Sequence, residues 1–591
     1  MDILELFEDA VEVVASLMRT GTVCAPAFSG GKDSSVTLLV AIHAAKRVKG
    51  EGFNPSLIVM NACTGVENPE NDIYAALELD KVREWCKSND ISNEIIVAKP
   101  SLAASWAMRI IGGRALPSFP GTNHDCTVEW KINPMQRERK KVLNPIIKSG
   151  TEVVTLIGTR FDESEARSRR MKDRGESSVQ PQRNKDGELV LAPIALFTTD
   201  EVWEILAMAQ AGEIESYSSF EETFRLYADG GGTSCAVVSD MAMSKASKAC
   251  GSRFGCWSCV AVANDVSMGH MIAGDKRYAY MAGLNRLRNF ISATRWDMNR
   301  RLWVGRSIKN GYISIGPDVY SPSMMRELLR YSLTLDRDER IRARDAGEHP
   351  RFEIVSMQAL VGIDAMWSLQ AYHKPHQAVM DYLDIVENGA GYYPPENMPV
   401  AIKPPKMPKT KYLYVGNDWG QDLGILSGMR DASLEAVSES GMSGCMGIRT
   451  LGNGAVVMDV NTDDSFDVDE EGVELAFTFE LEQLIETHKR ARPDWGLTAG
   501  YRYWVRMGII SLSPQQVVIH DMILRRSHFK EREGIAGEFF DLKKLLLRCV
   551  DSIPDGDGIT ETEADIKDGS EFLPVPEVVL PRQEAIQAEM F

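Results

Sequence analysis

The stretch Val23-Cys24-Ala25-Pro26-Ala27-Phe28-Ser29-Gly30-Gly31-Lys32-Asp33-Ser34-Ser35, followed by the apolar segment 36–45, decides the fold. It predicts a strand, a turn rich in glycine and hydroxyl groups, and a helix with Asp33 or Ser34 as its N-cap. Gly30 and Gly31 let the backbone turn tightly and present N–H groups to an anion, while the helix N-terminus and Lys32 add positive charge. The stretch therefore predicts a phosphate-binding loop.

The spacing excludes two common phosphate loops. The ATPase P-loop requires a glycine where this chain has Pro26, and it has no acidic residue after its lysine, where this chain has Asp33. The dinucleotide pattern G-x-G-x-x-G is absent as well. Pro26 cannot donate a hydrogen bond to a sheet, so we expect the strand to be shorter than the apolar run.

The loop 29–34 resembles the S-G-G-x-D-S loop of the PP-loop ATP pyrophosphatases, a family that includes PAPS reductases and sulfurtransferases. The resemblance implies that the loop binds the pyrophosphate end of ATP, whose α-phosphorus is the electrophile, together with Mg²⁺. The candidate nucleotide-binding residues are Ser29, Gly30, Gly31, Lys32, Asp33, Ser34, Ser35, Met60, Arg160 and Arg167. The candidate catalytic residues are Lys32, Asp33 and Arg160.

Three further segments match the PAPS-reductase branch in the same order. Residues 126–131 resemble its C-T-x-x-x-K segment, and residues 158–167 resemble its G-x-R-x-x-E-S-x-x-R segment. Residues 192–203 resemble its P-I…D-V-W ending, with Glu201 inserted. The resemblance covers roughly residues 20 to 210.

Length and composition indicate an ordinary globular protein without a membrane segment. The 591 residues are expected to form two to four domains, and no apolar run reaches membrane-spanning length. The ten cysteines are too sparse for a disulfide scaffold, and the N-terminus is unlike a signal peptide, so we expect a cytoplasmic location. The net charge of −18 excludes generic nucleic-acid binding over the whole surface.

Apolar strands alternate with amphipathic helices over about the first 200 residues. Strands are expected at 56–60, 94–97 and 153–158, and helices at 2–18 and around 77–85. This pattern predicts an α/β fold with a doubly wound, mostly parallel sheet of PP-loop type. A cysteine-cluster helical region and a C-terminal α+β domain should follow. The expected divisions are 1–210 (ATP pyrophosphatase), 211–310 (iron–sulfur region), 311–393 (helical), 394–410 (proline-rich linker), 411–550 (α+β) and 551–591 (acidic tail).

Arg160 and Arg167 follow the carboxyl end of a predicted buried strand, on the rim where the phosphate loop also opens. Arginine there can pair with phosphate oxygens. The alternative is that both are helix-surface arginines paired with Glu163 and Glu165. Lys131 can also reach phosphate, whereas the charge run 137–141 is expected to be a solvated helix face.

The cysteines form a second constellation. Cys250, Cys256 and Cys259 are closely spaced, and Cys126 lies in the nucleotide domain. Four thiolates can hold a [4Fe–4S] cluster or a zinc ion, and a trio with a distant fourth favours the cluster, with unligated redox cysteines as a third reading. Cys235 is an alternative to Cys126 or a sulfur carrier. The isolated Cys24, Cys63, Cys86, Cys445 and Cys549 are expected to be packing residues.

The phosphate loop, C-T-x-x-x-K and Gly255-Cys256-Trp257-Ser258-Cys259 together resemble the sulfurtransferase component of DNA phosphorothioation systems, the DndC and SspD type. The resemblance implies a [4Fe–4S] cluster on Cys126, Cys250, Cys256 and Cys259, DNA as substrate, and a cysteine desulfurase and other phosphorothioation proteins as partners. The expected reaction adenylates a backbone phosphate with release of pyrophosphate and then introduces sulfur. The alternatives are a PAPS/APS reductase-like oxidoreductase and a nucleotide-binding scaffold of a DNA modification complex.

Basic and aromatic residues are interleaved between 276 and 340, which suits DNA backbone contact and stacking. The alternative is a helical bundle whose arginines are solvated or paired with acids. His373 and His376 are expected in a loop or at a helix start rather than in a metal site. Past the prolines of 394–408, strands are expected at 412–415 and 455–458 and helices at 475–484 and 539–550.

Overall fold

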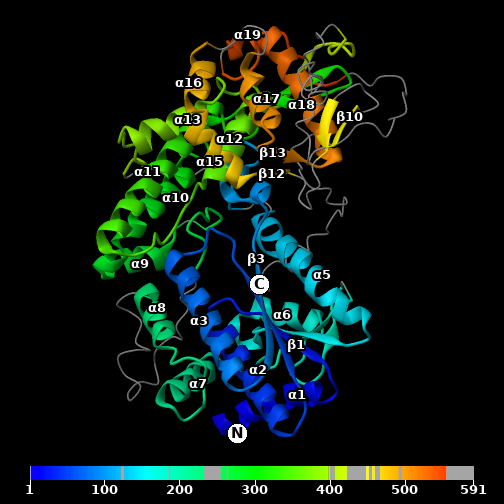
Figure 1. The fold of residues 1–591 in the computed structure, drawn as a ribbon, viewed down its shortest axis with the longest axis vertical. Helices are drawn as coiled ribbons and strands as arrows, with labels where there is room; N and C mark the ends of the chain where they lie inside the picture. Colours follow the sequence, from blue (N-terminus) through cyan, green and yellow to red (C-terminus); the bar gives the residue numbers. More distant parts are fainter. Residues whose placement is uncertain are drawn as a thin grey trace. The chain divides into compact units, whose positions relative to one another are not determined.

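The computed structural model describes residues 2–120, 125–185, 187–231, 254–262, 264–396, 398, 406–421, 447–450, 456–459, 466–490, 496–538 and 540–553. The chain forms two compact units (Figure 1). Unit 1 contains residues 1–100 and 120–285, and unit 2 contains residues 101–119 and the described residues from 286 onward. The segment 101–119, which the sequence places inside the nucleotide domain, therefore belongs to unit 2.

Unit 1 is built on a six-stranded sheet. Its strands are β1 (Val23–Pro26), β2 (Ser56–Ala62), β3 (Ser92–Ala98), β4 (Val153–Leu156), β5 (Gln182–Arg183) and β6 (Leu189–Leu191), in the order β3-β2-β1-β4-β6-β5. All neighbours are parallel except the β5–β6 pair. The chain order reverses direction at β1, the position at which open α/β sheets bind ligands beyond the carboxyl ends of their strands.

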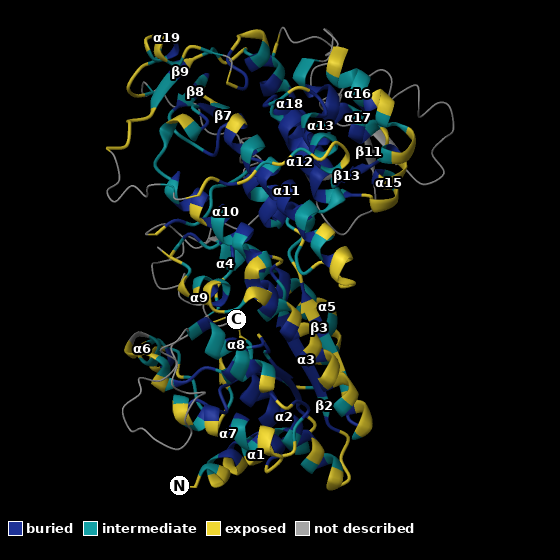
Figure 2. Ribbon diagram, turned by 90° about the vertical axis from the view of Figure 1, so that its left-hand side faces the viewer, coloured by how far each residue is buried: buried dark blue, intermediate teal, exposed yellow. Residues whose placement is uncertain are grey.

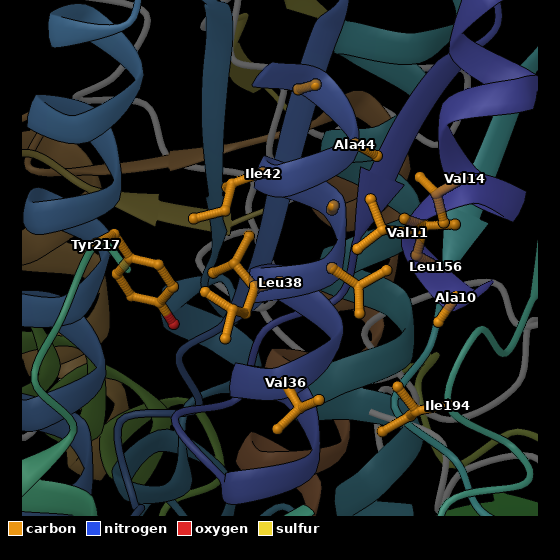
Figure 3. Packing of buried hydrophobic residues seen from close by; sticks show 14 of the residues in the cluster. Ala10, Val11, Val14, Val36, Leu38, Ile42, Ala44, Leu156, Ile194 and Tyr217 are labelled. Carbon is orange, nitrogen blue, oxygen red and sulfur yellow. The ribbon is translucent and has the colours of Figure 1, made fainter. Parts of the chain in front are cut away.

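Both faces of the sheet are covered, which the alternation of buried side chains requires. On one face Cys24, Leu57 and Val59 pack with α1 (Ile3–Arg19), α2 (Lys32–Gly50), α3 (Pro69–Ser88) and α7 (Thr199–Ala211). On the other face Ala25, Ile58 and Met60 pack with α5 (Asn133–Lys148). Figure 3 shows α2 between Tyr217 on one side and Val11, Val14 and Leu156 on the other. The predicted doubly wound, mostly parallel sheet is confirmed.

The burial pattern explains why α2 holds the site rigidly. Thirteen of its nineteen residues are buried, and Figure 2 shows the helix in the buried colour. Helix α1 instead buries one face only, formed by Phe7, Val11, Val14 and Met18, as its sequence predicts. A central helix with little solvent-exposed surface fixes the position of its N-terminus relative to the sheet.

The remaining elements of unit 1 lie between the strands or after them along the chain. They are α4 (Asp125–Thr127), η3 (Val128–Ile132), η4 (Phe161–Glu163), α6 (Glu165–Asp173), α8 (Glu221–Gly231), α9 (Val266–Gly274) and η6 (Lys276–Met281). The chain passes into unit 2 along α10 (Ala282–Ala293).

Unit 2 is mainly helical, with small antiparallel sheets. Its helices and helical turns are η1 (Leu102–Ala104), η2 (Ala107–Ile111), η7 (Met298–Arg300), α11 (Pro322–Ala346), α12 (Met357–Leu369), α13 (Gln377–Tyr382), η8 (Leu383–Glu387), α15 (Glu470–Phe479), α16 (Leu481–Arg490), η9 (Gly496–Thr498), α17 (Ala499–Arg506), α18 (Pro514–Arg532) and α19 (Leu542–Leu546). Its sheets are β7 (Val304–Lys309) with β8 (Tyr312–Ile315) and β9 (Lys411–Tyr414), β10 (Gly447–Thr450) with β11 (Val456–Asp459), and β12 (Phe466–Val468) with β13 (Ile510–Leu512). The Trp367 indole N–H donates to the Ile111 carbonyl at 2.8 Å and so ties the segment 101–119 to α12.

One detail of the C-terminal prediction is wrong. The predicted helix 539–550 is only the short α19, and Val550 instead forms a backbone bridge with Tyr412 of β9. The predicted strand at 412–415 is confirmed as β9, and its partner is β8. Residues 397 and 399–405 of the predicted linker and residues 554–591 of the predicted acidic tail lie outside the described residues. Among the described helices, none combines the length and apolar composition that a membrane crossing requires.

Candidate active site

The phosphate loop joins β1 to α2. Strand β1 ends at Pro26, and α2 begins at Lys32 with Gly31 as its N-cap. The predicted N-cap at Asp33 or Ser34 is therefore wrong. Both side chains have other partners. The Ser34 hydroxyl donates to the Gly31 carbonyl at 2.8 Å, and the Asp33 carboxylate forms ion pairs with Lys32 and Arg160. The N-cap residue offers no side chain to the first turn of α2, so backbone N–H groups of this turn can donate to an anion, that of Lys32 once it is released from the Tyr227 hydroxyl.

Close packing leaves little room for change around this loop. Gly30 has φ +74°, and a Cβ there would lie 3.1 Å from the Cβ of Ala75 on α3. Gly158, just beyond β4, approaches the first turn of α2 so closely that a Cβ would lie 3.0 Å from the Ser34 nitrogen. The loop is therefore held from two sides, and both contacts need glycine.

Three charged side chains meet at the start of α2. The Lys32 ammonium donates to Asp33 Oδ2 at 2.6 Å, and the Arg160 Nε donates to Asp33 Oδ1 at 2.6 Å. Arg160 is fully buried and also donates to the Phe197 carbonyl and the Thr199 hydroxyl, both at 3.2 Å. The structure thus places Arg160 behind Asp33, where it orients this carboxylate.

The second arginine of the predicted pair has a different environment. Arg167, on α6, forms an ion pair with Glu163, which is the alternative arrangement that the sequence left open for it. Both side chains also line the cavity described next. Arg167 therefore lines the cavity, whereas Arg160 lies behind Asp33.

A cavity of about 370 Å³ opens beside the loop. The predicted nucleotide-binding residues that line it are Ser29, Gly31, Asp33, Ser34, Met60 and Arg167. Its other walls come from the loop after β2, from α5 and η3, from α8 and from residues 254–256. Phosphate donors, carboxylates, a lysine and a cysteine therefore face one space.

The cysteine loop reaches this cavity because it is bonded to the loop after β2. The Trp257 N–H donates to the Val66 carbonyl at 2.8 Å, and the Trp257 side chain is buried. The Cys259 N–H donates to the Cys256 carbonyl at 3.0 Å. This turn places Cys256 on the cavity wall, and Cys256 and Cys259 also line a second cavity of about 510 Å³.

The cysteines of this region influence one another. Burial raises the pKa of Cys256 to about 12; the positive charge of Lys131 opposes this rise, and the charges of Cys259 and Cys126 add to it. A cation at these thiols would offset the desolvation, as in metal–thiolate sites. Ligation of a metal centre by Cys126, Cys256 and Cys259 stays a prediction; among the described residues, the candidate ligand atoms that lie within 4.8 Å of one another are those of Cys63, Glu67 and Asp72. Cys250, the fourth predicted ligand, and Cys235 lie outside the described residues.

Lys131 connects the cysteines with the carboxylates. Its ammonium lies 3.4 Å from Glu67 Oε1, and both residues line the cavity. Burial alone would lower the Lys131 pKa, but the interactions with Cys256 and Glu67 outweigh this effect, and the pKa is raised. Lys131, the lysine of the C-T-x-x-x-K segment, is therefore positively charged and lines the cavity.

Sequence reasoning missed two groups of this site. Glu67 and Asp72 line the cavity, and their carboxylate oxygens lie within 4.8 Å of each other and of the Cys63 Sγ. Cys63 was expected to be a packing residue. Glu67 lies in the loop after β2 and Asp72 in the first turn of α3, beyond the carboxyl end of a sheet strand, and this position is the signal that could have singled out these acids. Tyr227 on α8 also lines the cavity, and its motif-free helix gave no signal.

The predicted basic stretch 276–340 is largely paired with acids. Six of its arginines form ion pairs within their own unit: Arg277 with Asp275, Arg286 with Glu396, Arg300 with Asp297 and Glu327, Arg306 with Asp318, and Arg326 and Arg330 with Asp381. This is the alternative arrangement that the sequence left open. A DNA interface here stays a prediction.

The first part of the chain matches a known family. Residues 23–218 match the model of the phosphoadenosine phosphosulfate reductase domain. The matched range holds the phosphate loop, Lys131 and both arginines, and it ends before the cysteine loop. The resemblance to the PAPS-reductase-like family is thereby confirmed for this part of the chain, whereas DNA phosphorothioation stays a prediction.

Two solved structures are similar at 19% sequence identity. The NAD⁺ synthetase from Burkholderia pseudomallei has a TM-score of 0.23, with 38% of this chain and 74% of that chain covered. The U34-tRNA thiolase NcsA from Methanococcus maripaludis with its [4Fe-4S] cluster has a TM-score of 0.21, with 36% and 66% covered. No curated protein matches the chain.

Proposed function

We propose that unit 1 is an ATP pyrophosphatase that adenylates a phosphate oxygen of its acceptor and then replaces that oxygen with sulfur. One observation carries the proposal: the start of α2 and Cys256 line the same cavity. A nucleotide bound to the loop would therefore be activated next to the cysteines. The family match over 23–218 supports the nucleotide half, and the cysteine loop supports the sulfur half.

The nucleotide would be bound by groups that the site already presents. The N–H groups of the first turn of α2 would donate to phosphate oxygens, and Lys32 would add a full positive charge. Asp33, Glu67 and Asp72 line the cavity and are suitable oxygen ligands for Mg²⁺. When bound, Mg²⁺ neutralises the polyphosphate and stabilises the leaving pyrophosphate.

In the first step a non-bridging oxygen of the acceptor phosphodiester attacks the α-phosphorus of ATP. The bond from this phosphorus to the oxygen that leads to the β-phosphorus breaks, and pyrophosphate leaves with that electron pair. The product is a mixed anhydride of the acceptor phosphate and AMP. Lys32 would stabilise the charge that develops on the phosphates, and Arg160 would hold Asp33 in place.

In the second step hydrosulfide-level sulfur attacks the acceptor phosphorus. The bond to the AMP oxygen breaks, AMP leaves, and the proton of the hydrosulfide goes to solvent. One oxygen of the acceptor has then moved to AMP and one sulfur has replaced it, with no change in oxidation state. A persulfide donor would additionally require a dithiol reductant to supply two electrons.

The candidate ligands for a metal centre are Cys126, Cys250, Cys256 and Cys259, and the proximity of Cys126 and Cys259 to Cys256 supports this set. A [4Fe–4S] cluster, when bound, would supply a sulfur-binding and electron-transfer site beside the nucleotide. The residues of this chain would keep that site shielded, because Trp257 is buried against the loop after β2. Lys131 would offset the negative charge of the thiolates.

We further propose that the acceptor is DNA and that a cysteine desulfurase supplies the sulfur, in company with other phosphorothioation proteins. Support for this finer assignment comes from the sequence of the cysteine loop, Gly255-Cys256-Trp257-Ser258-Cys259, which follows the nucleotide domain. A phosphodiester also suits the first step, because its oxygen must be activated before sulfur can displace it.

The test is pyrophosphate release from ATP with DNA present, on protein purified without oxygen and assayed for iron and sulfide. Lys32→Ala should lower the rate by at least a hundredfold, and Lys46→Ala should leave it unchanged. Lys46 is the matched control, since it lies on the same helix but binds the exposed Glu215. Sulfite release from PAPS would favour the reductase instead, and ATP binding without turnover would favour the scaffold.

A further inference from the structure

The hydroxyl of Tyr227 lies in the mouth of the phosphate loop. The Lys32 N–H, one of the donors at the start of α2, donates to the Tyr227 oxygen at 3.3 Å. The same oxygen lies 3.4 Å from the position of a Cβ on Gly31. A side-chain oxygen thus occupies the acceptor position that a phosphate oxygen needs at this N–H group.

The ring of Tyr227 is held between two other aromatic rings. Its centroid is 5.0 Å from that of Trp203 on α7 and 5.3 Å from that of Phe254, both in edge-to-face geometry. Aromatic rings at these distances attract each other and transmit a displacement, because the interior is close-packed. A shift of the Tyr227 hydroxyl therefore moves a ring that contacts Phe254.

Phe254 connects this ring with the cysteines. It lies two residues before Cys256 and lines both cavities that Cys256 lines. Gly230, on the same helix as Tyr227, packs so closely on Phe254 that a Cβ there would lie 2.9 Å from the ring. Helix α8 thus contacts Phe254 at two points, and Phe254 has little room to move independently of it.

We infer that Tyr227 is a positioning residue that couples nucleotide binding to the cysteine loop. A phosphate oxygen displaces the Tyr227 hydroxyl from the Lys32 N–H, the tyrosine ring shifts against Phe254, and residues 254–259 change position or mobility. The inference rests on the proposed function in one respect, that the loop binds the phosphates of a nucleotide. It adds that the hydroxyl of Tyr227 competes with a phosphate oxygen for the Lys32 N–H group.

The first arm of the test measures affinity. The probe is the α,β-methylene analogue of ATP with Mg²⁺, which cannot release pyrophosphate, and binding is measured by calorimetry. Tyr227→Phe removes the competing oxygen and keeps the ring, so it should bind the probe three- to tenfold more tightly than wild type. Tyr278→Phe is the matched control, since its hydroxyl donates to Asp229 of α8 at 2.6 Å and its affinity should be unchanged.

The second arm measures hydrogen exchange in residues 254–262 and needs no variant. In wild type the probe should change exchange at the Trp257 and Cys259 amides, which donate to Val66 and Cys256.

The outcomes separate the two ideas. If wild type does not bind the probe, the proposed nucleotide site fails and the coupling fails with it. If wild type binds but exchange in 254–262 is unchanged, only the coupling is overturned. A Tyr227→Phe protein that binds less tightly would show that the hydroxyl supports the phosphate, and it would overturn the displacement.

Discussion

The two units use their buried charges differently. In unit 1 the side chains of Lys32, Asp33 and Arg160 meet at the N-terminus of α2, and Asp33 lines a cavity. In unit 2 the carboxylate of Asp381 is shared by Arg326 and Arg330, and Asp364 accepts hydrogen bonds from Trp504, His376 and the Ala378 backbone. Buried charge that faces a cavity can act on a ligand, whereas these groups of unit 2 hold helices together.

We expect the largest loss of activity from the unit 1 variant Asp33→Asn. The amide cannot pair with both Lys32 and Arg160, so pyrophosphate release should fall by about a thousandfold, as the lysine and arginine lose their orientation. Buried Arg160 would keep only its longer ion pair, 3.7 Å from Nη1 to Asp162 Oδ2, so the free energy of unfolding should also fall by about 2 kcal/mol. Initial rates and urea unfolding measure the two effects, and a rate within threefold of wild type would contradict the assignment.

Asp381→Asn tests whether a buried carboxylate of unit 2 serves stability rather than the reaction. Two arginines lose their shared carboxylate, which is 2% exposed, so unit 2 should lose about 3 kcal/mol of stability. ATP turnover per folded molecule should stay at the wild-type level. Pulse proteolysis in urea, with fragments assigned by mass spectrometry, measures the stability. A turnover defect in folded protein would show that unit 2 charges also serve the reaction.

Unit 2 should also be sensitive to acid. Burial lowers the pKa of His373 and His528 to about 4 and that of His520 to about 3. These histidines are neutral in the folded state but protonated in the unfolded state below pH 6.5, so stability is lost as pH falls from 6.5 towards 4. At pH 5 the loss is about 2 kcal/mol for each.

The carboxyl group of Asp336 in unit 2 has the opposite effect on stability, because its contribution becomes more favourable as the pH falls. Burial raises the pKa of Asp336 to about 7, so its contribution improves by about 2 kcal/mol as pH falls from 7 to 5. The informative measurement is therefore the difference between wild type and His520→Gln at the two pH values. The variant should lose about 2 kcal/mol less on acidification, and an equal loss in both proteins would contradict the assignment.

The smallest effect is expected from the backbone of unit 1. Gly158→Ala places a methyl group 3.0 Å from backbone atoms of Asp33 and Ser34, so the start of α2 must shift by a few tenths of an ångström. We expect three- to tenfold weaker binding of the ATP analogue and a stability loss of about 1 kcal/mol. Gly50→Ala is the control, because no atom lies within 4 Å of its added methyl group. Equal affinities in the two variants would refute a positioning role for this contact.

The parts of the fold that depend on local pattern were predictable. The sheet of unit 1 follows from apolar runs such as 56–60, which become a strand buried on both faces, and from the glycine turn after β1. The segment 101–119 was assigned to the nucleotide domain because nothing in its composition signals otherwise. Its place in unit 2 depends on a contact with Trp367, 256 residues away from Ile111.

The site was predictable where a motif carried it. Ser29, Asp33, Ser34 and Cys256 line the cavity, and each belongs to a motif. The sequence could not rank Arg160 against Arg167, because only the fold shows that the first is enclosed by Asp33, Phe197 and Thr199. Tyr227 was missed for the same reason, since its role comes from a contact with Lys32 across 195 residues.

The bond from Trp367 to the Ile111 carbonyl has a consequence for how the protein is made. Ribosomes release the chain from its N-terminus, so the piece containing Ile111 emerges long before the helix that receives it. Until Trp367 is synthesised, the apolar residues Ile110 and Ile111 lack their final neighbours. A nascent chain stalled before residue 357 should therefore bind chaperones through this piece, and a fragment of unit 2 that begins at residue 286 would lack the segment 101–119.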